Sequence, residues 1–209
     1  MPVIKDAKNA RYNENGTINA EVLFSDAFEP DGKTPKYLPF TASETDSMDY
    51  GRQLFADLKA GKYGAVTPFT VTPAMLTTAK EAKHAEINDW RNVQESANYV
   101  FQFNGRNWDY GKATQERLSL SVQMAKANKL PDGFIWTDAD NNDVPMTAGE
   151  LLNLSDAIDQ AMFTKGLQIH LRQRQMKEEV EKLTDYKSIR NYVVGWPPAD
   201  TTERATAGK

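Results

Sequence analysis

Hydrophobic and polar residues follow the same order twice in the second half of the chain. Residues 101–110 and 134–144 carry aromatic side chains among polar, turn-forming residues, which predicts two small β-hairpins. In the first of them, Asn104-Gly105 is the strongest two-residue turn signal, because both central positions of a type I′ turn need a positive φ. A stretch with the helical spacing of apolar residues follows each hairpin.

Amphipathic helices are therefore predicted from about Ala113 and after Thr147. Thr147 and Glu150 match a capping box, in which each side chain accepts a backbone N–H of the other residue. The apolar positions are Leu118, Val122 and Ala125, widened by Leu120 and Met124, in the first helix, and Leu151, Leu154, Ile158 and Met162 in the second. Aromatic strands packed against such helices form a structural scaffold. This pattern does not indicate a chemical activity.

The helical spacing resumes beyond Gly166, which marks either a kink or a break between two helices. The apolar positions of this part are Ile169, Met176, Val180 and Leu183. Thr184 or Asp185 is expected to cap a short last helix that carries Ile189, Tyr192 and Val193.

The first 40 residues carry strand and turn patterns. An Asn-Gly pair at 15–16, followed by β-branched residues, predicts a hairpin, and residues 30–35 form a loop. Ser43 is the expected N-cap of a helix that runs to about Ala60. The apolar face of this helix is Tyr50, Leu54, Phe55 and Leu58. Residues 65–71 are expected to be an extended linker, and we place a domain boundary there.

A long helix is predicted from Pro73 to about Ala97, with Thr72 as its cap and proline at its first position. Its first half is almost entirely alanine and charge, and only Ile87, Trp90 and Val93 form an apolar stripe. A half-helix that is polar all round is expected to project as a spacer or contact surface.

These elements define an α+β protein in two parts. Residues 1–70 form a small N-terminal module of a β-hairpin and a helix. Residues 71–196 form a C-terminal domain of helices with two short β-hairpins, led by the long helical connector. Residues 197–209 are proline, threonine, alanine and charge, which predicts a flexible tail.

Composition limits the classes of function. A net charge of −4 argues against binding to nucleic acid or to an anionic membrane. The chain has no cysteine, so it has no disulfide or thiolate metal site, and no apolar run approaches the ~20 residues that span a bilayer. The N-terminus lacks the pattern of a signal peptide, so we expect the product in the cytoplasm unless lysis releases it.

The sequence gives only weak evidence for a catalytic, metal-binding or cofactor-binding site. Asp138, Asp140 and Asn142 stand at the first ligand offsets of a calcium-binding EF loop, but Asp143 and Gly149 occupy positions that need glycine and glutamate. We expect an acidic turn without a metal. The two histidines, His84 and His170, are expected on the surface, and no glycine-rich nucleotide motif is present. No catalytic residue or cofactor is predicted.

Two further groups of side chains are candidates for binding surfaces. The basic residues Arg172, Arg174, Lys177 and Arg190 are expected to form a solvated face, because glutamates follow them directly. Aromatic residues dominate both cores and interfaces. We expect Trp108 and Trp136 to lie mostly in the core and Trp196 to be the most exposed tryptophan. The candidate partner contacts are Trp90, Trp108, Trp136, Trp196 and Tyr63.

Two sets of motifs, one in each part of the chain, carry a family resemblance. The C-terminal motifs are Trp90-Arg91, Phe103-Asn104-Gly105 with Trp108-Asp109, Gln115 with Arg117-Leu118, Trp136-Thr137 with Ala139-Asp140-Asn141, Met146-Thr147, Glu150-Leu151 and the helix from Gln168 to Met176. The N-terminal motifs are Gly16-Thr17-Ile18, Pro39 to Ser43, Tyr50 to Phe55 and Lys62-Tyr63-Gly64. With these motifs, residues 87–196 resemble a domain family of unknown function found in phage tail genes, and the N-terminal part is similar to phage tail-fibre assembly proteins.

The resemblance implies a tail-fibre-associated protein that acts by protein–protein contacts. It would be a fibre assembly chaperone or a small virion subunit on the fibre or baseplate, present in the host cytoplasm during assembly and in the virion tail if it is retained. A homo-oligomer is a further option. The alternative is a phage enzyme acting on host surface polysaccharide, which needs two carboxylates at a set separation.

Overall fold

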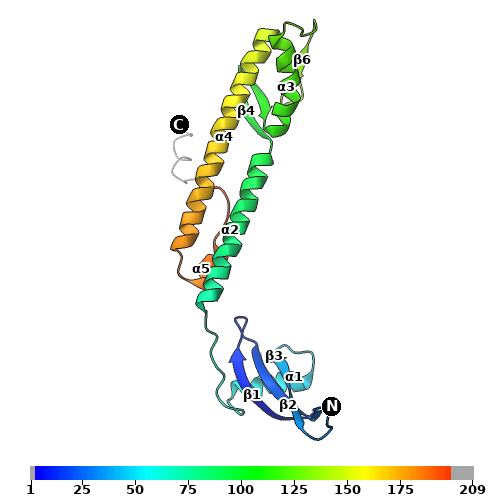
Figure 1. The fold of residues 1–209 in the computed structure, drawn as a ribbon, viewed down its shortest axis with the longest axis vertical. Helices are drawn as coiled ribbons and strands as arrows, with labels where there is room; N and C mark the ends of the chain where they lie inside the picture. Colours follow the sequence, from blue (N-terminus) through cyan, green and yellow to red (C-terminus); the bar gives the residue numbers. More distant parts are fainter. Residues whose placement is uncertain (1–2, 199–209) are drawn as a thin grey trace, which may run out of the picture. The chain divides into compact units, whose positions relative to one another are not determined.

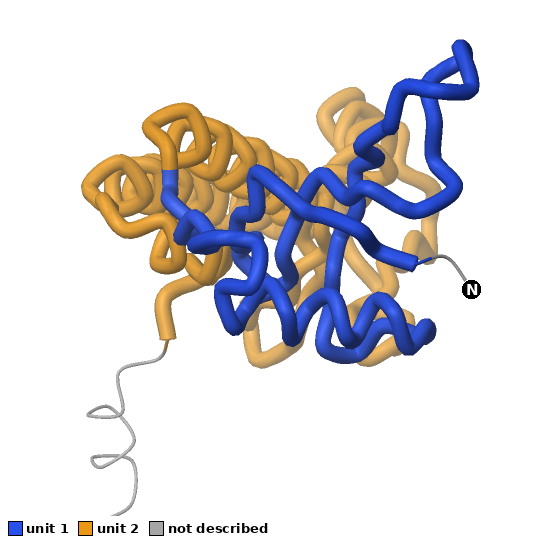
Figure 2. The backbone as a smooth tube through the Cα atoms, turned by 90° about the horizontal axis from the view of Figure 1, so that it is seen from below, with its two compact units in different colours: residues 1–71 blue, residues 72–209 orange. Residues whose placement is uncertain are grey.

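The structure, a computed structural model, describes residues 3–198. The chain divides into two compact units, residues 1–71 and residues 72–209 (Figure 2). The division follows Val71, inside the segment in which the sequence placed a boundary. Helices and small antiparallel sheets occur together, so the predicted α+β class is confirmed.

Unit 1 is a three-stranded antiparallel sheet with one helix. Its elements are β1 (Ile4–Tyr12), β2 (Ile18–Phe28), β3 (Pro35–Ala42) and α1 (Asp49–Lys59), and the strand order is β1-β2-β3. The predicted hairpin is present as β1 and β2, but the sequence analysis missed the third strand. Pro35 and Pro39 argue against a central strand, and both are tolerated here because β3 lies at the sheet edge.

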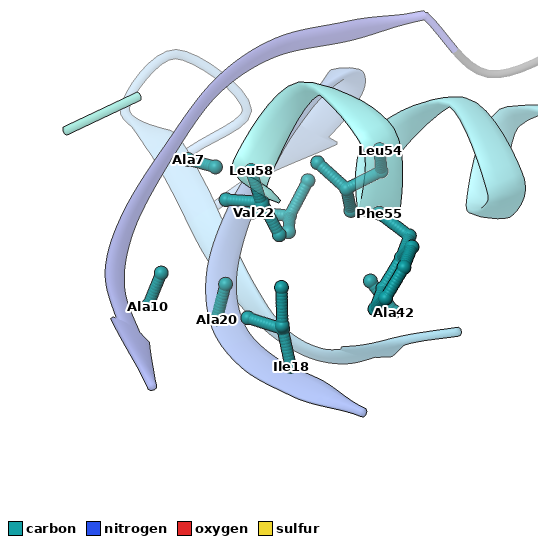
Figure 3. Close-up of a cluster of buried hydrophobic side chains, with 9 residues drawn as sticks. All are labelled: Ala7, Ala10, Ile18, Ala20, Val22, Ala42, Leu54, Phe55 and Leu58. Carbon is teal, nitrogen blue, oxygen red and sulfur yellow. The ribbon is translucent and has the colours of Figure 1, made fainter. Parts of the chain in front are cut away.

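The core of unit 1 forms where α1 crosses the sheet (Figure 3). Leu54, Phe55 and Leu58 of α1 are buried, as their spacing predicts, and Tyr50 is half-buried. They lie against small and β-branched side chains of the strands, which let the helix approach the sheet closely. These are Ala7, Ala10, Ile18, Ala20, Val22 and Ala42.

The predicted start of α1 is wrong. The N-cap is Met48, which forms no side-chain cap bond, and the helix begins at Asp49. Ser43 instead accepts the backbone N–H of Thr45 in a turn before the helix, at 3.2 Å. Serine competes well for such local bonds outside helices, which explains why its capping propensity misled the prediction.

The first part of the predicted linker is bonded to the sheet of unit 1. Thr67 joins the edge of the sheet beside β1, since its N–H donates to Ala10 O and its carbonyl accepts the N–H of Tyr12, both at 2.9 Å. The linker that carries no such bonds to the sheet is therefore shorter than predicted.

Unit 2 is built on two long helices that pack side by side, α2 (Pro73–Ser96) and α4 (Ala148–Lys182) (Figure 1). The short helix α5 (Tyr186–Asn191) packs on α2 near its start. The other end holds the remaining elements, which are β4 (Tyr99–Phe103), β5 (Arg106–Tyr110), α3 (Lys112–Lys126), β6 (Ile135–Thr137) and β7 (Asp143–Pro145). The two predicted hairpins are confirmed as β4-β5 and β6-β7.

Local signals placed most of these elements correctly. Thr72 caps α2 by accepting the N–H of Met75, and Asp185 caps α5. Both bonds of the capping box between Thr147 and Glu150 are present. The helix α4 continues through Gly166, which excludes the break that was one of the two alternatives at this residue. Burial of its inner face on both sides of the glycine outweighs the modest helix penalty of one glycine.

The buried hydrophobic side chains of unit 2 form two separate cores. The larger core surrounds the hairpins and consists of Trp108, Tyr110, Leu118, Ala125, Leu151, Leu154 and Ile158. The smaller core joins the long helices through Ile87, Met176 and Val180. Three residues expected on core faces are exposed instead, namely Val93, Leu120 and Val193. Val193 follows the end of α5, and the other two lie at the edge of their apolar stripes.

The first half of α2 packs against the end of α4 and against α5 instead of projecting alone, although none of its residues before Ile87 is buried. Lys80 Nζ donates to the carbonyl of Glu181 at the end of α4, at 2.7 Å, and His84 Nε2 lies 3.2 Å from Glu181 Oε1. Alanines on this half let α5 approach. The contacts are polar or small, so no apolar stripe could indicate them, and the predicted surface histidine His84 is half-buried.

We predict that Gly105→Val destabilises unit 2 by about 1–3 kcal/mol, because a β-branched residue fits a positive φ poorly. Asn104 and Gly105 have φ values of 49° and 73°, as a type I′ turn requires. All four tryptophans lie in unit 2, so tryptophan fluorescence in urea measures its unfolding alone.

Gly166→Ala is the matched control. A Cβ at Gly166 meets no atom within 4 Å, and alanine is expected to stabilise the helix by about 0.5–1 kcal/mol. An unfolding midpoint of Gly105→Val equal to that of the wild type would show that the turn does not need a positive φ.

Candidate interaction surface

Three large apolar side chains lie exposed on successive turns of α4. Phe163 is 72% exposed, Leu167 47% and Leu171 57%. Residues four apart lie on one face of a helix, so the three side chains form one continuous stripe. We call it the α4 stripe. Contiguous exposed apolar surface is uncommon on monomeric proteins and marks sites of interaction.

The α4 stripe is separate from the face that holds the fold together. Ile158, Ile169, Met176 and Val180 are buried and face the rest of unit 2. The helical spacing of these buried residues was recognised in the sequence, whereas that of Phe163, Leu167 and Leu171 was missed. A helix needs only one apolar face to pack on a core. A second set of apolar residues at helical spacing in the same helix could therefore have revealed the α4 stripe.

Charged residues flank the α4 stripe with opposite signs. Asp156 and Asp159 are exposed on the side toward the start of the helix, and Arg174 is exposed on the other side. An apolar centre with a polar, charged rim is the usual anatomy of a protein interface.

A second candidate surface, which is aromatic, lies where the segment after α5 packs against α2. The rings of Trp90 and Trp196 meet edge to face, with centroids 5.1 Å apart, and Trp196 Nε1 donates to Gln94 Oε1 at 3.0 Å. Lys165 Nζ lies 5.6 Å from the centre of the Trp196 ring. Trp196 remains 41% exposed, so it is both packed and accessible.

Arg172 holds this segment in place, which corrects the prediction that it lies on a solvated basic face. Its side chain is buried and Nε donates to the carbonyl of Gly195 at 2.7 Å. Arg172 also pairs with Glu179 at 3.7 Å, and Glu179 accepts the hydroxyl of Tyr192 at 2.5 Å. Burial, together with the hydrogen bond to Glu179, raises the pKa of Tyr192 to about 12.

The five candidate contact residues do not form one surface. Trp90 and Trp196 are adjacent. Trp108 is 3% exposed and its Nε1 donates to Phe103 O, so it is a core residue. Trp136 is half-buried at the hairpin end of unit 2, and Tyr63 is half-buried in unit 1.

The acidic turn at Asp138 is organised by its own hydrogen bonds. Asp138 Oδ1 accepts the backbone N–H groups of Asp140 and Asn142, at 3.0 and 2.8 Å, and Oδ2 lies 3.2 Å from Arg106 Nη1. The backbone N–H of Asn142, followed by its side chain and Arg106, lowers the pKa of the Asp138 carboxyl despite its burial. Within residues 3–198, no group of three or more acidic or histidine side chains is placed to hold a metal.

Unit 2 is thus a pair of long helices with two β-hairpins at one end and an exposed apolar stripe. Residues 78–194, more than half of the chain, match the family model described as Domain of unknown function (DUF4376), and the chain belongs to this family. No curated protein and no solved structure matches the chain. In the part of the chain that the structure describes, no helix is long and apolar enough to cross a membrane.

We predict that the stabilising effect of Asp138 depends on pH. A carboxyl whose pKa is lowered by folding stabilises the fold above its unfolded pKa, about 3.9, and loses this effect as pH falls through the folded value. The unfolding midpoint of the wild type in urea should therefore exceed that of Asp138→Asn at pH 7, and the difference should shrink below about pH 4.

Asp132→Asn is the control, because Asp132 is exposed and has no side-chain partner within residues 3–198. It should match the wild type throughout the series. A difference between the wild type and Asp138→Asn that is constant from pH 7 to pH 3 would contradict the assigned hydrogen bonds.

Proposed function

We propose that this protein binds a phage tail-fibre or baseplate protein through the α4 stripe. It would serve as a fibre assembly chaperone or as a small subunit retained in the virion. The observation that carries the binding role is the exposure of Phe163, Leu167 and Leu171 on one helical face. The assignment to a phage tail rests on the sequence motifs alone.

Three physical features support a role in protein contacts. The α4 stripe is presented by a 35-residue helix that is held by α2, so it is displayed without ordering cost. Charges of both signs flank it, which gives a partner a defined orientation. Trp196, which is partly exposed on a fixed segment, offers an additional aromatic contact of the kind that concentrates binding energy.

The test is binding of the tail-fibre protein of the phage that carries this gene. We expect Leu167→Glu to weaken binding by about thirtyfold or more, since loss of a central apolar anchor costs at least about 2 kcal/mol. Leu120→Glu is the matched control, because Leu120 is 64% exposed on α3 and lies outside the stripe. Equal binding by both variants would contradict the proposed surface.

The same two variants distinguish a partner from self-association. Light scattering gives the mass of the isolated protein. If a second copy of the chain covers the stripe, Leu167→Glu lowers that mass and Leu120→Glu does not. A fibre partner requires that the mass of both variants equals that of the wild type.

A further inference from the structure

A polar pocket of about 500 Å³ lies at the hairpin end of unit 2 and shares no residue with the α4 stripe. Its volume is within the range of about 300–1,000 Å³ that is usual for small-molecule sites. It is an open pocket lined by residues of β5, of the start of α3, and of β6 with the turn that follows it. The residues that bear on its chemistry are Asp109, Thr114, Arg117, Trp136, Asp138 and Asn141.

Two oppositely charged side chains in the pocket, Asp109 and Arg117, form no ion pair within residues 3–198. Asp109 lies on the face of β5 opposite the buried Trp108 and Tyr110 and, within residues 3–198, its carboxylate forms neither a hydrogen bond nor an ion pair. Arg117 makes a single long contact of 3.4 Å, to Thr114 Oγ1. The pocket therefore offers an acceptor carboxylate and a donor guanidinium that are more than 4 Å apart.

Trp136 adds an apolar wall with a polar edge. It is half-buried against the core of unit 2, and part of its surface lines the pocket. In the described part of the chain its indole N–H has no hydrogen-bond acceptor, although buried tryptophans usually have one. Trp136 thus contributes part of the apolar lining of a pocket that also holds the two charges.

The wall formed by the acidic turn is rigid before any ligand binds. Asp138 fixes the turn through its bonds to Asp140, Asn142 and Arg106. The turn is also attached to β5, because the N–H of Ala139 donates to Asn107 O at 2.9 Å and Asn107 Nδ2 donates to Asp140 Oδ2 at 3.1 Å. A preformed pocket loses less affinity to ordering.

We propose that this pocket binds a neutral sugar ring. Asp109 and Arg117 carry opposite charges, so a ligand with a strong charge of one sign would meet a like charge at one of them, whereas a neutral ring meets none. A carboxylate accepts hydroxyl hydrogens and a guanidinium donates to hydroxyl oxygens, so together they match neighbouring hydroxyls on one ring. The C–H face of the same ring is apolar and fits the Trp136 surface.

Asp138 does not fit the role of the acid in a glycosidase. Glycoside hydrolysis needs one carboxylic acid with a raised pKa beside a second carboxylate. Asp109 and Asp138 are the two carboxylates of the pocket, and Asp138 has its pKa lowered by the hydrogen bonds of the turn. Asp138 therefore stays ionised and cannot supply the proton. The inference goes beyond the proposed function, because it concerns a different site and a ligand that is not a protein.

The experiment follows the indole N–H signals of the full chain by NMR while glucose, galactose, mannose or N-acetylglucosamine is added. We expect at least one sugar to shift the Trp136 signal saturably at millimolar concentration and to leave the Trp90 signal unchanged. Asp109→Asn and Arg117→Gln should each weaken this binding by about tenfold, as loss of a hydrogen bond to a charged group does.

Arg11→Gln is the matched control, because it removes an exposed arginine of β1, in unit 1, and should leave sugar binding unchanged. Either of two results overturns the proposal. One is the absence of a saturable Trp136 shift with all four sugars, and the other is a shift that both pocket variants retain in full. Fibre binding measured with Leu167→Glu is independent of these results.

Discussion

The packing of α2 against α4 is the interaction on which unit 2 depends. Neither two-stranded hairpin nor the six-residue α5 could be stable alone, and each of them needs a larger surface to pack on. The shared core of the long helices is small, with Ile87, Met176 and Val180 at its centre. Polar pairs supplement it. Gln173 accepts from Arg91 Nη1 at 2.8 Å and donates to Asn88 Oδ1 at 3.0 Å.

These polar pairs fix the register of the two helices. An apolar contact tolerates sliding, whereas a buried amide such as Gln173, with 8% of its surface exposed, loses its partners if the helices shift. The fixed register determines the rotation of α4 about its axis. The inner face of α4 is filled in this way, so Phe163, Leu167 and Leu171 contribute little to folding. Exposure of these apolar side chains to water is unfavourable, and a role in binding would explain why it is retained.

Sequence patterns predicted the parts of the fold that depend on neighbouring residues. The turn at Asn104-Gly105, the capping box at Thr147 and the inner face of α4 follow from local rules and were correct. The third strand of unit 1, the burial of Arg172 and the contacts of the first half of α2 depend on segments distant in the sequence. The spacing of residues along one helix could not reveal these contacts, because polar and small side chains carry them.

The candidate sites show the same division. The pattern of tryptophans identified Trp90 and Trp196 as possible contacts but could not show that they meet, or that Trp108 is a core residue. The α4 stripe was missed, because only one apolar face was expected on each helix. It also dismissed the turn at Asp138 for metal binding and so overlooked the pocket beside it, which forms only when β5, α3 and β6 come together.

Hydroxyl-radical footprinting tests the central claim most directly, because it measures the solvent exposure of individual side chains. The isolated protein would be compared with its complex with the tail-fibre protein that we propose as its partner. The account predicts that oxidation of Phe163, Leu167 and Leu171 falls in the complex while that of the exposed Leu120 is unchanged. Equal oxidation of the three stripe residues in both states, with a complex formed, would contradict it.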